Sequence, residues 1–275
     1  MTRMGRKKLA DTIIIAVILF VGILFIMPYV WMILNSFKDR IEIMKAKTFW
    51  PDEFTISNYI TVFEDSPIIS WFKNSVLVTV IGTLLMLFTS SIAGFVFAKY
   101  EFKAKNMVFL FVLATMMVPA QVTMIPSFLI IDALHMYDTM AALIVPTMVG
   151  GFGIFLCRQF IEDIPSALCE AASIDGASDF YIYSRIIVPL IRPALGALTI
   201  FTFLSKWNDY LGPLLYLSDP KNMTMPLALN FFAGQKSSDI GAIMAAATLV
   251  TLPVTIVYLC LQKQFIKGIA ISGMR

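Results

Sequence analysis

Two ionisable residues, Lys206 and Asp209, interrupt a stretch of the chain that is otherwise apolar enough to cross a membrane. A charged side chain costs about 2.5–3.5 kcal/mol at the centre of such a helix, so it usually faces a cavity or a partner. The i, i+3 spacing lets the two side chains meet on one helix face. Two interpretations stay open: a pair near the membrane surface that only neutralises itself, or part of the lining of a polar path.

Further polar residues fall at a comparable depth. Lys206 lies roughly 20 Å along its helix from Pro193, at about 1.5 Å per residue, and Asn208 is its near neighbour. Gln121 and Thr123 lie between two prolines of an earlier apolar segment, where freed backbone carbonyls must be covered by protein or line a cavity. Polar residues of two segments at one depth predict a shared cavity. The candidate path residues are Gln121, Thr123, Lys206, Asn208 and Asp209.

The sequence does not indicate enzyme chemistry. The single histidine, His135, cannot form a metal site alone, and no phosphate-binding loop ending in Gly-Lys-Ser/Thr occurs. The cysteines Cys157, Cys169 and Cys260 have no paired spacing and are interpreted as reduced, structural residues. We therefore expect a non-catalytic chain without cofactor or metal. Any ATP hydrolysis that drives it must come from another subunit.

A polar interval, residues 159–192, separates two apolar segments and contains Glu-Ala-Ala-Ser-Ile-Asp-Gly-Ala at positions 170–177. Pro165 suits the first turn of a helix, because its missing N–H would have no partner there. A short helix is therefore predicted over Ser166–Ile174. Gly176 can end this helix, since glycine adopts the left-handed conformation without steric penalty.

A second short helix is predicted after this turn, capped by Ser178 and with Asp179 in its first turn. Pro189 is expected to stop it, and Pro193 to open the next apolar helix. Small side chains on the first helix would let another protein approach closely, so the interval is predicted to be a docking element. The alternative is an ordinary surface helix–turn–helix in which Asp175 and Asp179 serve only the helix ends. The predicted contact face is Leu168, Ala171 and Ala172.

The composition places these elements in a membrane. Of the 275 residues, 59% are hydrophobic and only 14% are charged, against roughly 25% charged in a soluble domain. The clusters of Lys and Arg predict that both chain ends lie inside. We expect an all-α polytopic membrane protein with cytoplasmic tails at 1–11 and 263–275 and a transmembrane domain at 12–262. The six predicted spans are Thr12–Leu34, Ser70–Ala98, Met107–Ile131, Met140–Leu156, Pro193–Tyr216 and Ile240–Leu261.

The interval at 159–192 resembles the cytoplasmic EAA loop of permease subunits of ATP-binding-cassette (ABC) importers. The resemblance rests on Glu170-Ala171-Ala172, then Asp175-Gly176-Ala177, followed by Ile187 and the prolines at 189 and 193. Phe54-Thr55-Ile56-Ser57-Asn58-Tyr59, Trp207-Asn208-Asp209 and Gln264 to Gly268 look like the carbohydrate branch of this family. Over nearly the whole chain, the spacing is similar to that of the maltose-type second permease subunit.

This resemblance implies a type I importer permease fold in a bacterial or archaeal cell membrane. It also implies a second permease subunit, two ATPase subunits and an extracytoplasmic sugar-binding protein as partners, and no nucleic acid. The loop would then couple the chain to the ATPases. The coupling residues would be Leu168, Glu170, Ala171, Ala172, Asp175, Gly176, Ala177 and Pro189.

Two further expectations concern the transported sugar. Trp207 and Tyr210 would give it an aromatic face. Within the outer loop Leu217–Ser238, the stretch Lys221–Lys236, with its apolar centre Met225–Ala233, would face the external binding protein. The alternative function is a stand-alone channel or secondary transporter. A secondary transporter would show corresponding broken helices in two halves, whereas the sequence shows one helix strongly broken by prolines.

Overall fold

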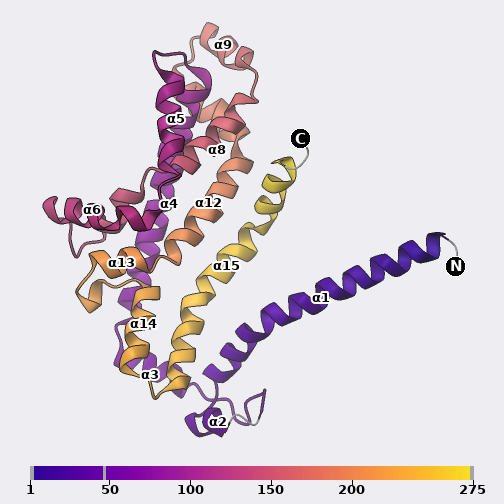
Figure 1. Ribbon diagram of the computed structural model, residues 1–275, viewed down its shortest axis with the longest axis vertical. Coiled ribbons are helices and arrows are strands. Elements are labelled where there is room, and N and C mark those ends of the chain that lie inside the picture. The colour runs from indigo at the N-terminus through magenta and orange to yellow at the C-terminus, as the bar shows by residue number, and fades with distance from the viewer. Residues whose placement is uncertain (1–2, 46–47, 273–275) are drawn as a thin grey trace. The chain divides into compact units, whose positions relative to one another are not determined.

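The computed structural model describes residues 3–45 and 48–272, and Figure 1 shows its helices. All regular structure in these residues is helical. The chain divides into two compact units, one formed by Met1–Ile68 with Leu229–Leu252 and the other by Ile69–Ala228 with Pro253–Arg275. The helices that continue from one unit into the other are α4 (Ile68–Lys99), α14 (Met225–Gln235) and α15 (Ile240–Ser272).

The first unit contains α1 (Arg3–Ser36), α2 (Arg40–Lys45) and α3 (Ser57–Asp65), with the end of α14 and the start of α15. The side-chain amide of Asn58 joins α3 to the end of α1 by donating to the backbone carbonyls of Ser36 (2.9 Å) and Lys38 (2.8 Å). Lys236 and Asp65 form an ion pair at 2.6 Å. These contacts hold α3 between the end of α1 and the turn that joins α14 to α15.

The second unit contains most of the remaining helices. In Figure 1, α9 lies at the end of the unit where α4 ends, and α6 and α13 lie farther from that end. The elements after α4 are α5 (Lys105–Thr115), α6 (Ala120–Ala133), α7 (Ala141–Ile144), the 3-10 turn η1 (Val145–Thr147), α8 (Gly151–Glu162), α9 (Ser166–Ile174), α10 (Asp179–Tyr181), the π-helical η2 (Ile182–Ile187), α11 (Val188–Leu190), α12 (Arg192–Trp207), α13 (Leu211–Tyr216) and the 3-10 turn η3 (Pro220–Asn222).

Three helical stretches, Asp11–Ser36, Ile68–Lys99 and Ile240–Cys260, are each long and apolar enough to cross a membrane. Three bent pairs of helices would bring the number to six if each pair is one span. The bends are 99° between α5 and α6, 42° between α7–η1 and α8, and 79° between α10–α11 and α12. Breaks therefore occur in three segments, and the expectation of one broken helix is wrong.

The local causes of the bends differ from the predicted ones in part. Pro119 lies at the N-cap of α6 with extended backbone, as a helix-breaking proline should, but Pro126 stays inside α6. The predicted fourth span is broken at Gly150, whose extended backbone (φ −146°, ψ 132°) precedes α8. Helix α8 then continues to Glu162, so Arg158 lies within a helix and not in the loop.

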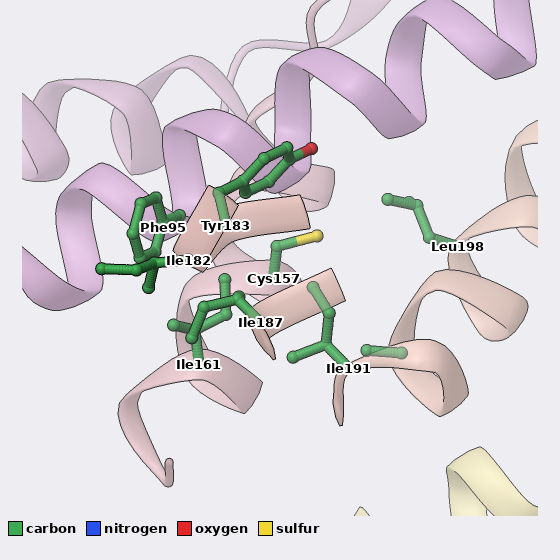
Figure 2. Packing of buried hydrophobic residues seen from close by; sticks show 9 residues of the cluster. Phe95, Cys157, Ile161, Ile182, Tyr183, Ile187, Ile191 and Leu198 are labelled. Carbon is green, nitrogen blue, oxygen red and sulfur yellow. The ribbon is translucent and has the colours of Figure 1, made fainter. Parts of the chain in front are cut away.

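The core of the second unit lies beside the polar interval. Figure 2 shows its buried side chains, among them Phe95 of α4, Cys157 and Ile161 of α8, and Ile187 of η2. Tyr183 joins this core to α4 through a hydrogen bond of 2.7 Å between its hydroxyl and that of Ser91. The polar interval is therefore built on a packed apolar base.

Asp138 joins the turn after α6 to the loop after α13. Its carboxylate accepts hydrogen bonds from the backbone N–H groups of Ser218 (3.0 Å) and Asp219 (3.2 Å) and from the side chain of Asn222 (3.2 Å). Burial acts to raise the pKa of Asp138, but these hydrogen bonds outweigh burial and lower it below its ordinary value. The ionised carboxylate therefore stabilises this connection.

We expect Asp138→Asn to lower the stability of the folded chain by about 1 kcal/mol at neutral pH. Because the folded-state pKa lies below the unfolded value of about 4, the contribution of the carboxylate is present above pH 4 and is lost as the pH falls through the folded-state pKa. The difference in melting temperature from the unmodified chain should therefore shrink in acid. Asp132→Asn, at an exposed residue of α6, is the control. An equal shift for both variants at every pH would contradict this role.

The apolar centre of the predicted outer loop is helix α14, not an exposed connector. Met225, Leu227, Ala228 and Phe232 are buried, so they pack within the protein. Ser75 accepts a hydrogen bond of 2.7 Å from the backbone N–H of Met225 and fixes the start of the helix. An exposed apolar patch at this place was the reason to expect a docking surface for a binding protein, and that reason is wrong.

Candidate coupling loop and translocation pocket

The first helix of the polar interval has the predicted bounds, Ser166–Ile174, and a glycine end. Gly176 has φ +83°, in the left-handed region. The backbone N–H of Ala177 donates to the carbonyl of Ala172 (2.9 Å), and that of Gly176 to the carbonyl of Ser173 (3.0 Å). This pair of bonds is a Schellman motif, which satisfies the free carbonyls at the helix end. A Cβ at position 176 would meet nothing within 4 Å, so only the backbone conformation demands glycine.

The second helix begins at the predicted cap and ends close to the predicted stop. Ser178 is its N-cap and accepts a hydrogen bond of 3.3 Å from the N–H of Tyr181, as predicted. Helical geometry then continues through η2 and α11 to Leu190. Pro189 lies one residue before the end of this helical stretch, so the helix ends within two residues of the predicted stop. The chain turns at Ile191, and Pro193 opens α12 as predicted.

The loop is fastened to the end of α4. The ammonium group of Lys99 donates a hydrogen bond to the carbonyl of Ile164, just before α9. Burial and a hydrogen bond to Asp179 raise the pKa of Tyr100 to about 12, so its hydroxyl stays protonated at physiological pH. Asp179 therefore acts in attachment as well as at the helix end. These contacts position α9 and α10 relative to the membrane-spanning helices.

The two faces of α9 differ in their surroundings. Cys169 and Ala172 pack against the core of Figure 2, as does Ala177 after the helix. Leu168 is 47% exposed and Ile174 is 86% exposed, and Glu170, Ala171, Asp175 and Gly176 are exposed as well. The predicted contact face therefore needs one correction, because Ala172 faces the chain's own core. Leu168, Ala171 and Ile174, spaced i, i+3 and i+6, form the free apolar face.

Lys206 lies in a cavity of about 670 Å³ within the second unit. Its ammonium group donates to the hydroxyl and, at 3.4 Å, to the carbonyl of Thr147 in η1. A Cβ at Gly82 of α4 would lie 2.8 Å from the end of the lysine side chain, so glycine is needed for the lysine to lie along α4. Lys206 of α12 therefore contacts both α4 and η1, and these three elements form one wall of the cavity. The cavity is lined by Met86, Pro146, Thr147, Val149, Phe152, Phe201, Thr202, Ser205, Lys206 and Asp209.

Asp209 lines the same cavity but forms no ion pair with Lys206 within 4 Å in the part of the chain that the structure describes. Its carboxylate accepts a hydrogen bond of 3.1 Å from the backbone N–H of Gly212, at the start of α13. The direct ion pair that the i, i+3 spacing allows is therefore not formed, and the choice between a self-neutralising pair and a path lining stays a prediction. The cavity holds a separate cation and anion together with several hydroxyl groups.

The other predicted path residues do not line this cavity. Gln121 and Thr123 are exposed on α6, which turns away from α5 by 99°. The side chain of Asn208 donates to the carbonyl of Leu204 in its own helix (2.9 Å). Trp207 is only 1% exposed and stacks on Phe203, with ring centroids 5.9 Å apart. Trp207 is therefore a core residue, and the prediction that it offers a face to a sugar is wrong.

Sequence reasoning missed several lining residues. Thr147 comes from η1, Ser205 and Thr202 come from α12, and Phe152 and Phe201 meet edge to face with centroids 6.0 Å apart. Ser205 and Thr202 could have been found, because they lie one and four residues before Lys206 on the same helix. Thr147 and Gly82 could not, because only the packing of α4 and η1 on α12 brings them to the lysine.

Known transport permeases are similar to this chain over most of its length. The arabinooligosaccharides transport system permease protein AraQ of Bacillus subtilis is 33% identical, and the match covers 92% of each chain. The lactose transport system permease protein LacG of Rhizobium radiobacter is 32% identical, and the match covers 96% of each chain.

The fold is that of a solved importer subunit. A chain in the crystal structure of a bacterial ABC transporter, one involved in the import of the acidic polysaccharide alginate, superposes with a TM-score of 0.85 at 24% identity, over 96% of this chain and 99% of that one. The sequence profile described as "Binding-protein-dependent transport system inner membrane component" matches residues 90–271. The all-helical protein with a projecting loop and a polar membrane cavity belongs to this family of transport permeases.

Proposed function

We propose that this chain is one of two permease subunits of an importer for a sugar or oligosaccharide. The solute would be delivered by an extracytoplasmic binding protein, and two ATPase subunits would bind on the cytoplasmic side. Membership of the family of binding-protein-dependent permeases supports the binding protein as a partner. The relatives named for arabino-oligosaccharides and lactose support a sugar as the solute. The chain itself would catalyse no reaction.

The exposed apolar face of α9 is the observation that carries this proposal. Leu168, Ala171 and Ile174 are exposed in the described part of the chain, whereas Cys169 and Ala172 are partly buried against the core. Such a face, on a helix whose end is fixed by Gly176, suits insertion into a cleft of an ATPase subunit. Glu170, Asp175 and the backbone at Gly176 would form the polar edge of this contact. Ala172, Ala177 and Pro189 would act beneath it, by holding the loop on its base.

The cavity beside Lys206 would form this subunit's part of the translocation path. Its hydroxyl groups, one ammonium group and one carboxylate can exchange hydrogen bonds with a hydroxyl-rich solute, and its phenylalanine rings can pack on the apolar faces of a sugar. We place Thr147, Lys206 and Asp209 in this path. Gln121, Thr123 and Asn208 would reach the solute only where another subunit or another state of the transporter brings it to them.

The proposed topology follows from the loop. If α9 docks on cytoplasmic ATPases, residues 159–192 and both chain ends lie in the cytoplasm, and the membrane domain spans 12–262. The predicted C-terminal tail, residues 263–275, overlaps helix α15, which runs to Ser272, and residues 273–275 lie outside the described residues. The proposed cellular location is the bacterial or archaeal cell membrane.

Site-directed photocross-linking from α9 tests the proposal. We expect a benzophenone label on Leu168→Cys or Ala171→Cys to cross-link to a co-purified ATPase subunit, whereas Ala172→Cys gives at most a weak product because that position packs inward. The variants are made in a chain whose three native cysteines are replaced by alanine, after that chain is shown to transport normally.

Three outcomes would contradict the proposal. One is a cross-link pattern equal at positions 171 and 172. Another is the absence of any ATPase product throughout the hydrolysis cycle in a complex that still transports. The third is sugar uptake by this chain alone in liposomes, which would favour a stand-alone channel or secondary transporter.

A further inference from the structure

The segment from α2 to α3, residues 40–65, exposes large apolar side chains although it is not a membrane-spanning helix. Trp50 is 65% exposed, Met44, Phe54 and Ile56 are exposed to a similar extent, and Ile60 (47%) and Phe63 (51%) are about half exposed. The ring of Phe49 meets that of Trp50 edge to face, with centroids 6.0 Å apart. An exposed apolar surface of this extent normally marks a site of contact with another protein or with a membrane.

Helix α3 shows what kind of environment would fit, because its surface divides into three stripes. Successive residues of a helix lie about 100° apart, so Ile56 and, in the helix, Ile60 and Phe63 fall on one narrow exposed stripe. The stripe beside it is polar and exposed, with Ser57 and Glu64.

The third stripe of α3 faces the protein. Asn58 and Val62 are buried there, and Asn58 lies so close to Gly241 of α15 that a Cβ on this glycine would collide with the asparagine amide. Tyr59 adds a hydrogen bond of 2.7 Å between its hydroxyl and that of Ser36. The side of α3 with Asn58 and Val62 thus packs on other helices of the first unit. The side with Ser57 and Glu64 is polar and exposed, and the side with Ile60 and Phe63 is apolar and exposed.

The ends of the segment lie at membrane boundaries. It begins just after Asp11–Ser36 and ends just before Ile68–Lys99, two stretches that are long and apolar enough to cross a membrane. The segment must therefore return to the surface from which it left. A helix at that surface needs adjacent apolar and polar stripes, and tryptophan is the side chain that prefers the interface between lipid and water.

We propose that the segment from α2 to α3 lies in the lipid headgroup layer, with Trp50, Ile60 and Phe63 inserted among the upper parts of the acyl chains and Glu64 in water. The segment would act as a membrane-surface anchor that fixes the height of α1 and α15 in the bilayer. This inference depends only on the chain crossing a membrane. It holds whether or not the solute is a sugar and whether or not α9 binds an ATPase.

The test compares two adjacent positions that lie about 100° apart around α3. Spin labels are attached to Phe63→Cys and, separately, to Glu64→Cys, in the cysteine-free chain assembled with its co-purifying subunits in lipid nanodiscs. Power saturation then measures the accessibility of each label to oxygen, which concentrates in lipid, and to a water-soluble nickel chelate. We expect the ratio of oxygen to nickel accessibility to be severalfold higher at position 63 than at position 64.

Each alternative covering of the stripe gives a distinct result. Strong exposure to nickel at both positions would mean that the stripe faces water, and low access of both reagents at position 63 would mean that a protein subunit covers it. Either result would overturn the proposal. A second measurement keeps all native cysteines: brominated lipids should quench a component of the tryptophan fluorescence that is absent from Trp50→Phe. Equal quenching in both chains would also contradict insertion of Trp50.

Discussion

Replacing Gly176 with valine is expected to reduce transport about tenfold while the chain still reaches the membrane. A residue with a Cβ costs roughly 1–2 kcal/mol in the left-handed conformation, and about 1.4 kcal/mol corresponds to a factor of ten in binding. Gly176 has φ +83° and completes both hydrogen bonds of the helix end. With valine, the loop would relax to another backbone conformation and turn the face of Leu168 and Ala171 away from its partner.

The structure provides a matched control for this variant. Beyond the two neighbouring residues, no described atom lies within 4 Å of a Cβ at position 176, so the Cβ itself causes no clash. Asparagine tolerates the left-handed conformation better than other residues with a Cβ, so Gly176→Asn should retain most of the docking and transport. The measurements are the amount of ATPase that co-purifies and the uptake per assembled complex. Equal losses in the two variants would show that the backbone conformation at position 176 is not the cause.

Replacing Lys206 with methionine is expected to reduce transport per assembled complex by tenfold or more. Hydrogen bonds to charged groups contribute about 1.5–3 kcal/mol, and methionine keeps the length of the side chain while it removes the ammonium group. The variant loses the bonds to Thr147 and the only cation that lines the cavity in the described part of the chain. Uptake must be normalised to the amount of purified complex, because a purely structural lysine would lower that amount instead.

Two companion variants separate the charge of Lys206 from its position. Thr147→Val keeps the ammonium group but removes the hydroxyl that binds it. Gly82→Ala places a methyl group 2.8 Å from the lysine side chain and forces the lysine to move. If the charge matters most, both companions should transport better than Lys206→Met. If all three variants transport at the normal rate per complex, Lys206 has no part in the path.

The parts of the fold that follow local rules could be predicted from the sequence. Helix α9, its left-handed glycine and the cap at Ser178 depend on residues within a few positions of one another. The six apolar segments follow from composition for the same reason. Pro189 predicted the end of the second helix to within two residues, because the chain turns at Ile191, directly after Leu190.

The residues of the cavity depend on packing between distant segments, which the sequence does not display. Trp207 has the composition of a sugar-binding residue but is stacked on Phe203 in the core. Asp209 has the spacing of a partner for Lys206, yet the lysine binds Thr147, 59 positions earlier. Ala172 differs from Ala171 only in the direction it faces on α9, and one step along a helix turns a side chain by about 100°.

The helical stretch Asp179–Leu190 of the polar interval and helix α12 meet at Ile191 with a bend of 79°. Ile191 is buried at this bend, and Lys206 lies near the opposite end of α12. Because α12 is roughly 24 Å long, a rotation of about 10° at the bend would displace its far end by about 4 Å. That displacement exceeds the reach of the hydrogen bond from Lys206 to Thr147. A small tilt of the loop would therefore be enough to open or reshape the cavity at the other end of the helix.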